Sequence, residues 1–453
     1  MIQTRRRPLT APALARVIGD HRSPTPGPTL VIIGGLHANE HAGIEAAQRV
    51  HNTITSGGAP MRRGRVIALR GNLAALAEAH ETPHDRRRYI DEDLNRAFVP
   101  GNDSNESRSV EQAERAELDA AFDAISAQSQ GPVYLLDLHT FSSESPPFIV
   151  LEDALPTRRF AAAFPLPKVL GLEEELQGLL IDDVTTRRGF VSCIVEAGQH
   201  EDTRAIDIHE AIVLIALETL GIVDHGAEAS LGERPFEVAD RAAGYWARRF
   251  YDVRQRVGIT HESFRMDESA KALMPVRARR TIIAHERAHP MVAETGGVLF
   301  LPNRQADRGP GDDAFFIIQR VGSIWLGLSA VLRNIEAVHC LMCKILPGVR
   351  SRPGDPHAIL VAPEYAAVLR RELLHLLGYR LIRWTHPEHL TRVGRIARAL
   401  RGLVDAVVGV AAHAFRGGER HALPIERNSD WIARRRRLDL DPPRIARKQG
   451  STP

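Results

Sequence analysis

A histidine and a glutamate three residues apart, His37 and Glu40, follow a short apolar segment of the chain. That segment, residues 30–33, is rich in β-branched residues; two glycines come directly after it, and a helical pattern begins at Gly43. We therefore expect a buried strand that ends in a tight turn and leads into a helix. An imidazole and a carboxylate at this spacing can bind one metal ion, and nitrogen and oxygen donors suit zinc. The pair alone is a weak indication, because an exposed turn could carry the same two residues.

Two further apolar segments also end in side chains that bind metals or transfer protons. Residues 133–139 are apolar as far as Asp137 and end in His139, and residues 189–197 carry Glu196 near their end. Ligands of open α/β sheets bind beyond the carboxyl ends of the strands, so we expect these strand ends to meet at one site. Asp137 is not assigned as a metal ligand, because it could point to the opposite face of its strand.

Predicted strands alternate with predicted helices through the first half of the chain. The expected strands are residues 30–33, 65–70, 133–139, 148–151 and 189–197, and the expected helices are residues 43–55, 110–127 and 203–220. This alternation predicts an α/β fold with a mixed, mostly parallel sheet that is covered by helices.

The pattern changes beyond residue 221, which predicts three parts. Residues 1–225 are expected to form the catalytic α/β domain, and residues 226–325, with short β segments and turns, a small β-rich second domain. Residues 326–453 are expected to form a helical C-terminal extension with a basic tail, with helical segments at residues 365–377 and 389–413.

Charge and composition indicate a globular protein rather than one that binds nucleic acid or membranes. The chain of 453 residues has a net charge of +3 and only four lysines, so nearly all of its positive charge is arginine. This charge does not gather in a stripe except at the C-terminus, and no segment reaches the ~20 apolar residues of a membrane span. The first residues lack the apolar core of a secretory signal, and three cysteines are too few for a disulfide framework. We therefore expect a cytoplasmic protein.

Several other chemistry-bearing side chains have ordinary structural explanations. Cys340 and Cys343 form a single C-x-x-C without a second pair, so buried thiols are a better interpretation than a metal or redox site. The arginines at residues 434–437 could contact nucleic acid or a membrane, but a solvated terminus is the commoner meaning of such a run. We expect structural or surface roles for four further histidines, His41, His80, His84 and His200.

Four motifs together resemble the succinylglutamate desuccinylase/aspartoacylase family, zinc amidohydrolases with a zinc-carboxypeptidase-like α/β fold. The motifs are G-L-H-A-N-E at residues 35–40, R-Y-I-D-E-D-L-N-R-A-F at 88–98, D-L-H-T at 137–140 and V-E-A-G at 195–198. They occur in the order found in the family, and the D-L-N-R element is quite specific. The resemblance covers residues 29–222; Ala38 stands where a glycine is common. The β-rich region is compatible with the family's smaller second domain, and the C-terminal extension is not covered.

The resemblance implies one Zn²⁺ per chain, bound by His37, Glu40 and His139, with a fourth position open for water. Zinc lowers the pKa of bound water to about 7 and polarises a carbonyl group. Glu196 would be the general base that takes the water's proton and passes it to the departing amine. Arg88 would polarise the scissile carbonyl and stabilise the oxyanion.

The resemblance also implies residues that bind the substrate. Asn95 and Arg96 would hold a carboxylate, for which the planar fork of arginine is well suited. The family uses another arginine shortly before the catalytic glutamate; Arg187 and Arg188 both lie in that region, and the spacing does not choose between them. A tyrosine from the second domain often completes the family's site, and we assign no tyrosine of this chain to it.

These features predict a zinc-dependent hydrolase that cleaves the amide bond, or less readily an ester bond, of a small N-acylated carboxylate. Its expected partner is this small anionic substrate, without nucleic acid or membrane, and the sequence leaves open whether the chain forms homo-oligomers. One alternative is a zinc carboxypeptidase that acts on peptides. Another is a catalytically silent binding protein with the same fold, which the intact set of motif residues disfavours.

Overall fold

The computed structural model describes residues 14–81, 87–99, 109–224, 233–304, 308–346, 348–352, 355–362, 373–383 and 431–435. The described residues fall into two compact units, one that runs as far as Arg320 and one that begins at Val321. Across the described ranges, no helix combines the length and the apolar character needed to cross a membrane. His84, the expected helix at 389–413 and residues 436–437 of the basic tail lie outside the described residues.

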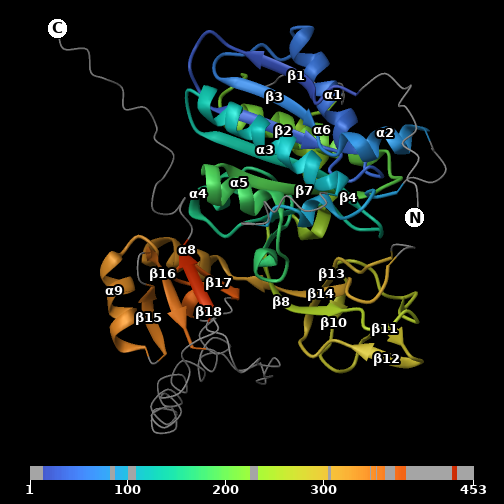
Figure 1. Cartoon of the computed structure of the whole chain (residues 1–453), viewed down its shortest axis with the longest axis vertical. Helices are drawn as coiled ribbons and strands as arrows, with labels where there is room; N and C mark the ends of the chain where they lie inside the picture. Colours follow the sequence, from blue (N-terminus) through green and yellow to red (C-terminus); the bar gives the residue numbers. More distant parts are fainter. Residues whose placement is uncertain are drawn as a thin grey trace, which may run out of the picture. The chain divides into compact units, whose positions relative to one another are not determined.

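The first unit is built on an eleven-stranded sheet with the order β1-β3-β2-β4-β7-β5-β6-β8-β14-β13-β10 (Figure 1). Its strands are β1 (Val17–Arg22), β2 (Thr29–Gly34), β3 (Arg65–Arg70), β4 (Val133–Phe141), β5 (Phe148–Leu151), β6 (Lys168–Leu170), β7 (Val191–Gln199), β8 (Phe250–Gly258), β10 (Pro275–Val276), β13 (Gly297–Phe300) and β14 (Asp313–Val321).

The centre of this sheet is parallel. Strand β2 pairs in parallel with β3 and β4, and β4 pairs in parallel with β7. Strand β1 is antiparallel to β3, and β5 is antiparallel to β7, so the sheet as a whole is mixed. Residues 30–33 of β2 are completely buried, as expected for a strand covered on both faces. The prediction of a mixed, mostly parallel sheet covered by helices is confirmed.

Two groups of helices pack on this sheet (Figure 1). Helices α1 (Ala42–Thr55) and α6 (Arg204–Thr219) pack against each other, and both contact β2 and β4. Helices α3 (Val110–Gln128) and α5 (Leu180–Arg188) pack together, and α5 contacts β7. The remaining helices of this half are α2 (Leu73–Glu81) and α4 (Leu155–Ala162). Each helix buries its apolar face against the sheet or a neighbouring helix. This packing holds the ends of the strands in place.

The start of helix α1 lies directly against the ends of two central strands. A Cβ atom on Gly34 would lie 2.7 Å from the carbonyl carbon of Gly43, and a Cβ atom on Gly43 would lie 2.7 Å from Cβ of Leu138. Only glycine fits such a close approach of backbone to backbone or side chain. The turn between β2 and α1 is therefore held tightly against the end of β4.

The segment expected to form a small β-rich domain does contain mainly strands. Strands β8, β14, β13 and β10 continue the large sheet, and β9 (Arg265–Met266), β11 (Ile282–Glu286) and β12 (His289–Val292) form a separate three-stranded sheet. Helix α7 (Pro235–Ala243) precedes them. A separate cluster of buried side chains, including Phe315 and Ile283, lies between these strands. All of these strands fall in the first compact unit.

The second unit contains both helices and strands. Helices α8 (Ser323–Leu332) and α9 (Glu336–Ile345) precede an antiparallel sheet of β15 (Val349–Arg352), β16 (Asp355–Val361), β17 (Tyr379–Arg383) and β18 (Trp431–Arg435). The prediction of a helical extension was therefore incomplete. Apolar segments as short as those of β16 and β17 do not distinguish a strand from a buried helix by their period.

Candidate metal centre and active site

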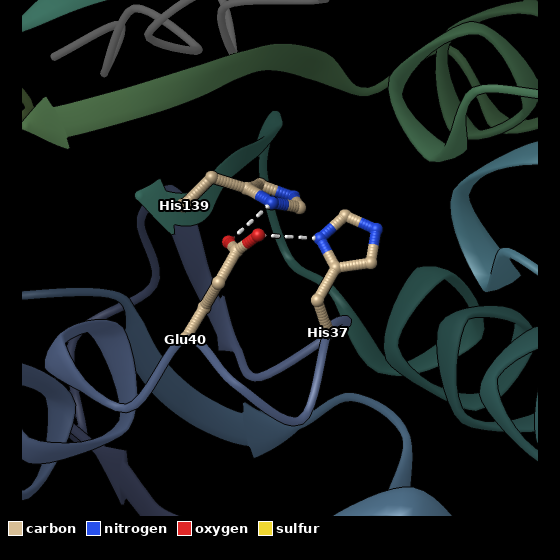
Figure 2. Close-up of side chains that lie close together, drawn as sticks. All are labelled: His37, Glu40 and His139. Atoms are coloured by element: carbon tan, nitrogen blue, oxygen red, sulfur yellow. Dashed lines mark hydrogen bonds and ion pairs between the residues drawn. The ribbon is translucent and has the colours of Figure 1, made fainter. Parts of the chain in front are cut away.

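His37, Glu40 and His139 come together at the carboxyl edge of the parallel strands. Their ligand atoms all lie within 4.8 Å of one another, and all three side chains are buried. Strands β2 and β4 are neighbours in register, so the turn after β2 and the end of β4 lie side by side. Figure 2 shows both imidazole rings in contact with the Glu40 carboxylate, marked by two dashed lines.

The Glu40 carboxylate is the centre of this cluster. Its Oε1 lies 2.8 Å from Nδ1 of His37, and its Oε2 lies 2.9 Å from Nδ1 of His139 and accepts a 3.0 Å hydrogen bond from the backbone N–H of Thr140. Burial raises the pKa of Glu40, but the two histidines outweigh it and hold the pKa well below its ordinary value. Two imidazole nitrogens and one carboxylate in a buried position are the donor set of a catalytic zinc site. The three residues therefore fit a zinc ion by their chemistry.

A second carboxylate lies close to Nε2 of each histidine of the cluster. Nε2 of His37 lies 3.0 Å from Oδ1 of Asp93, and Nε2 of His139 lies 2.9 Å from Oδ2 of Asp137. Carboxylates in these positions fix the ring orientation of metal-binding histidines and so keep Nδ1 directed at the metal position. The expectation that Asp137 could point away was wrong, because residues two apart in a strand share a face.

Arg88 lies against the cluster, as its predicted role requires. It donates from Nη1 to Oε1 of Glu40 at 3.0 Å, and its Nε and Nη2 lie 3.4 Å from Oδ2 of Asp93. Its carbonyl oxygen accepts a hydrogen bond from the backbone N–H of Ala38, the residue after the first histidine of the cluster. Its guanidinium is therefore a fixed positive charge beside the Glu40 carboxylate.

Glu196 lies beside His139, because the two residues are directly paired across β4 and β7. The pKa of Glu196 is raised to about 8, chiefly by burial; His139 and Arg88 act to lower it, and Glu40 and Asp137 act to raise it. Among the described residues, Oε2 of Glu196 is buried without a hydrogen-bond partner. A carboxyl group with a free oxygen and a pKa close to neutral can accept a proton and return it.

Asn95 and Arg96 lie in a short 3-10 helix, η1 (Leu94–Arg96), that Asp93 caps through the N–H of Asn95. Oδ1 of Asn95 accepts a 2.9 Å hydrogen bond from the N–H of Leu180, which leaves the Nδ2 group of Asn95 as a donor. Arg96 donates from Nη1 to the carbonyl oxygen of Asn95, and it is among the charges that lower the pKa of Asp93, after His37 and Arg88. Both side chains therefore offer N–H donors near the cluster.

Arg187 and Arg188 are engaged elsewhere. Arg187 pairs with Asp119 and Asp183 at 3.2 Å, and Arg188 pairs with Asp183 at 2.8 Å and with Asp119 at 2.9 Å. The pairs with Asp119 join α5 to α3, and those with Asp183 lie within α5. The structure therefore does not bring the two arginines to the metal cluster, and their predicted role in substrate binding has no support from these contacts.

His200, for which we expected a structural or surface role, lies half-buried beside the cluster. Its Nδ1 is 2.8 Å from Oγ1 of Thr140, and Thr140 in turn donates its backbone N–H to Glu40. Burial lowers the pKa of His200, so its ring is neutral near pH 7. The sequence contained one signal for this placement: His200 follows Glu196 by four residues, and it comes directly after the end of β7 at Gln199.

The comparisons with known proteins agree with this arrangement. A model of the succinylglutamate desuccinylase/aspartoacylase catalytic domain matches residues 26–217, which include the metal cluster and Glu196. The matched residues make up less than half of the chain. The resemblance that the sequence motifs indicated is thereby confirmed for these residues.

Two curated proteins with which the chain shares similarity are succinylglutamate desuccinylases. The similarity to the protein of Burkholderia thailandensis is 31% identity over 115 residues, and to that of Burkholderia pseudomallei 30% over 115 residues. In both cases the matched segment is 25% of this chain and 30% of the relative. The chain thus spans less than a third of the length of the curated relatives it matches.

Solved structures of the family also resemble this chain. The succinylglutamate desuccinylase of Vibrio cholerae has 17% identity and a TM-score of 0.48, with 66% of this chain and 83% of that chain covered. The succinylglutamate desuccinylase/aspartoacylase of Rhodobacter sphaeroides has 19% identity and a TM-score of 0.49, with 66% and 87% covered. Murine aminoacylase 3 has 16% identity and a TM-score of 0.47, with 66% and 97% covered.

Proposed function

We propose that this chain is a zinc-dependent amidohydrolase that removes the acyl group from a small N-acyl amino acid or a similar carboxylate. The observation that carries the proposal is the buried cluster of His37, Glu40 and His139, in which both histidines present Nδ1 to one carboxylate and Nε2 to another. The family of residues 26–217 and the desuccinylase relatives support an acyl amino acid as the substrate.

His37, Glu40 and His139 would hold one zinc ion per chain. A bound zinc supplies a Lewis acid for the scissile carbonyl and lowers the pKa of water to about 7. Asp93 and Asp137 lie against Nε2 of the two imidazole rings and would hold them in the orientation that turns Nδ1 towards Glu40.

Glu196 would move the proton of the reaction. Its ionised carboxylate accepts the proton of the attacking water and delivers it to the nitrogen of the departing amine. Burial raises the pKa of Glu196 to about 8. The positive charge of a zinc ion held by the neighbouring His139 would lower this pKa and so keep the carboxylate ionised until it accepts the proton. Such proton transfer typically contributes ~10²–10⁴-fold to the rate.

Arg88, Asn95 and Arg96 would bind and polarise the substrate. Arg88 stabilises the negative charge that develops on the carbonyl oxygen in the transition state, and it is already held beside Glu40. The N–H donors of Asn95 and Arg96 suit a carboxylate of the substrate. An ester would meet the same groups, but the relatives point to an amide.

The first experiment compares the metal content and activity of the wild-type chain with two variants. We expect one zinc per chain in the wild type and its loss in His37→Ala. We expect Glu196→Gln to keep the zinc but to lose activity by about 10²–10⁴-fold on N-acetyl or N-succinyl amino acids. His21→Ala is the matched control, because His21 contacts His51 and not the cluster.

Three results would contradict this proposal. Absence of zinc from the wild type after zinc is supplied would exclude the metal centre. Normal activity in Glu196→Gln would exclude this residue as the general base. Zinc bound without turnover of any acyl amino acid would favour a catalytically silent binding protein on the same fold.

A further inference from the structure

Glu111 is a completely buried carboxylate that lies outside the metal cluster, in the first turn of helix α3. Its oxygens accept four hydrogen bonds. Oε1 accepts from Nδ2 of Asn72 at 3.1 Å and from the backbone N–H of Ile90 at 2.8 Å. Oε2 accepts from the backbone N–H groups of Asp91 at 3.0 Å and Glu92 at 3.2 Å. One side chain therefore satisfies three consecutive backbone donors.

These three donors belong to the loop that connects Arg88 to Asp93, here called the Arg88 loop (residues 88–93). Both ends of the Arg88 loop touch the metal cluster. Arg88 donates to Glu40, and Asp93 contacts Nε2 of His37. Whatever fixes the backbone of residues 90–92 therefore also fixes the position of these two side chains.

The Arg88 loop has no regular secondary structure to fix it otherwise. The backbone N–H groups of residues 90–92 have no helical or strand partner, and buried donors without partners are strongly unfavourable. Helix α3 and the loop also bond in the reverse direction, since Oδ2 of Asp91 accepts from the N–H of Val110 at 2.8 Å. The loop is thereby bound to the start of α3 from both sides.

We propose that Glu111 is a positioning residue, which holds the Arg88 loop in the one conformation that places Arg88 and Asp93 against the metal cluster. The effect of Glu111 on the geometry follows from its hydrogen bonds alone. Its effect on turnover rests on the function proposed above, in which Arg88 acts on the reacting carbonyl.

The substitution Glu111→Gln tests this proposal with little change in volume. A glutamine presents an NH₂ group where the carboxylate accepted hydrogen bonds, so two N–H donors would face two other N–H donors. A displacement of about 1 Å at a catalytic group can reduce the rate by ~10²-fold. We expect kcat to fall by about 10–100-fold with a smaller change in KM, because Arg88 acts mainly on transition-state charge. With zinc in excess, the zinc content should stay at the wild-type value, since no metal ligand lies in the Arg88 loop; displacement of Asp93 from His37 should appear only as a weaker affinity for zinc.

Glu114→Gln is the matched control. Glu114 lies one turn further along α3, is also buried, and accepts the backbone N–H groups of Leu73 at 3.1 Å and Ala74 at 3.0 Å. These donors belong to the start of α2 and not to the Arg88 loop. The control therefore loses comparable hydrogen bonds of a buried carboxylate, so its melting temperature should fall similarly while its kcat stays at the wild-type value.

Amide hydrogen exchange of the full-length, zinc-loaded protein gives a readout that does not depend on turnover. In Glu111→Gln, exchange should accelerate at residues 90–92 and at Ala38, whose N–H is bonded to the carbonyl oxygen of Arg88. In Glu114→Gln, exchange at these positions should match the wild type. A double variant, Arg88→Gln with Glu111→Gln, should lose little more activity than Arg88→Gln alone, because Glu111 acts through Arg88.

Unchanged exchange in the Arg88 loop of Glu111→Gln would overturn the proposal. So would accelerated exchange with a wild-type kcat, or an equal loss of kcat in Glu114→Gln. If the wild type hydrolyses no acyl amino acid but the exchange pattern is as expected, the positioning role stands and the proposed function fails.

Discussion

Lys168 is a buried lysine, 1% exposed, in strand β6 of the large sheet. Its ammonium group donates to the carbonyl oxygen of Phe164 and lies 5.7 Å from the centre of the Phe250 ring. Burial lowers the pKa of Lys168 from 10.5 to about 8. This difference corresponds to about 3 kcal/mol of free energy by which the charged lysine disfavours the folded state.

The sign of the resulting pH dependence is fixed by the direction of the pKa change. Between pH 8 and pH 10.5 the unfolded chain keeps this proton while the folded protein has released it. The free energy of unfolding therefore rises with pH over this interval, by up to about 3 kcal/mol from this group. Below pH 8 the lysine is charged in both states, and the folded protein bears the whole penalty.

We expect Lys168→Met to stabilise the protein at pH 7. Removal of the buried charge gains about 3 kcal/mol and loss of the hydrogen bond to Phe164 costs about 1 kcal/mol, so the variant should be more stable by about 2 kcal/mol. At pH 10 this advantage should fall to about zero, because most of the penalty has disappeared from the wild type by then.

Urea-induced unfolding at pH 7 and pH 10, followed by far-ultraviolet circular dichroism, measures both differences. Lys271→Met is the control, since the Lys271 side chain is 71% exposed and its removal should change stability little at either pH. A Lys168→Met variant that is less stable than the wild type at pH 7 would refute the argument. So would a stabilisation of equal size at both values of pH.

Two further predictions concern the site and its surroundings. Asp137→Asn should weaken zinc binding by about 10–100-fold, because the ring of His139 would no longer be held in one orientation. Competition with a chelator measures the zinc affinity. An affinity equal to that of the wild type would show that Asp137 has no such role. Arg188→Gln should leave kcat/KM unchanged but lower the free energy of unfolding by about 3 kcal/mol, because the buried carboxylate of Asp183 would have fewer partners. Denaturant unfolding and a parallel activity assay separate the two effects. A large loss of activity would show that Arg188 does belong to the site.

The metal cluster could be predicted from the sequence because its residues follow apolar strands directly. Each of His37, His139 and Glu196 lies at or just beyond the end of a parallel strand, and parallel strands end at one edge of a sheet. The roles of the neighbouring carboxylates could not be predicted in the same way. The role of Asp137 depends on the strand face that it shares with His139. Asp93 becomes a partner of His37 only after its loop has folded.

Contact between segments distant in the chain limits what the sequence alone can predict. Arg187 and Arg188 were candidates for the site because they precede Glu196, but α5 packs on α3, whose acidic residues attract both side chains. The sheet of the second unit pairs β16 with β18, which are separated by about 70 residues of chain, and no local pattern reveals such pairing.

The pairing of β2 with β4 has a consequence for the order in which the protein folds. His37 and Glu40 are separated from His139 by roughly 100 residues, so a complete ligand set exists only after these two strands have paired. A zinc ion bound by these residues therefore could not nucleate the fold in the way that zinc nucleates a zinc finger, whose ligands are close in sequence. It would act by binding the native state, and at a free concentration 100 times its Kd it would stabilise that state by about 2.7 kcal/mol. Removal of the metal should accordingly lower the melting temperature while the sheet still forms.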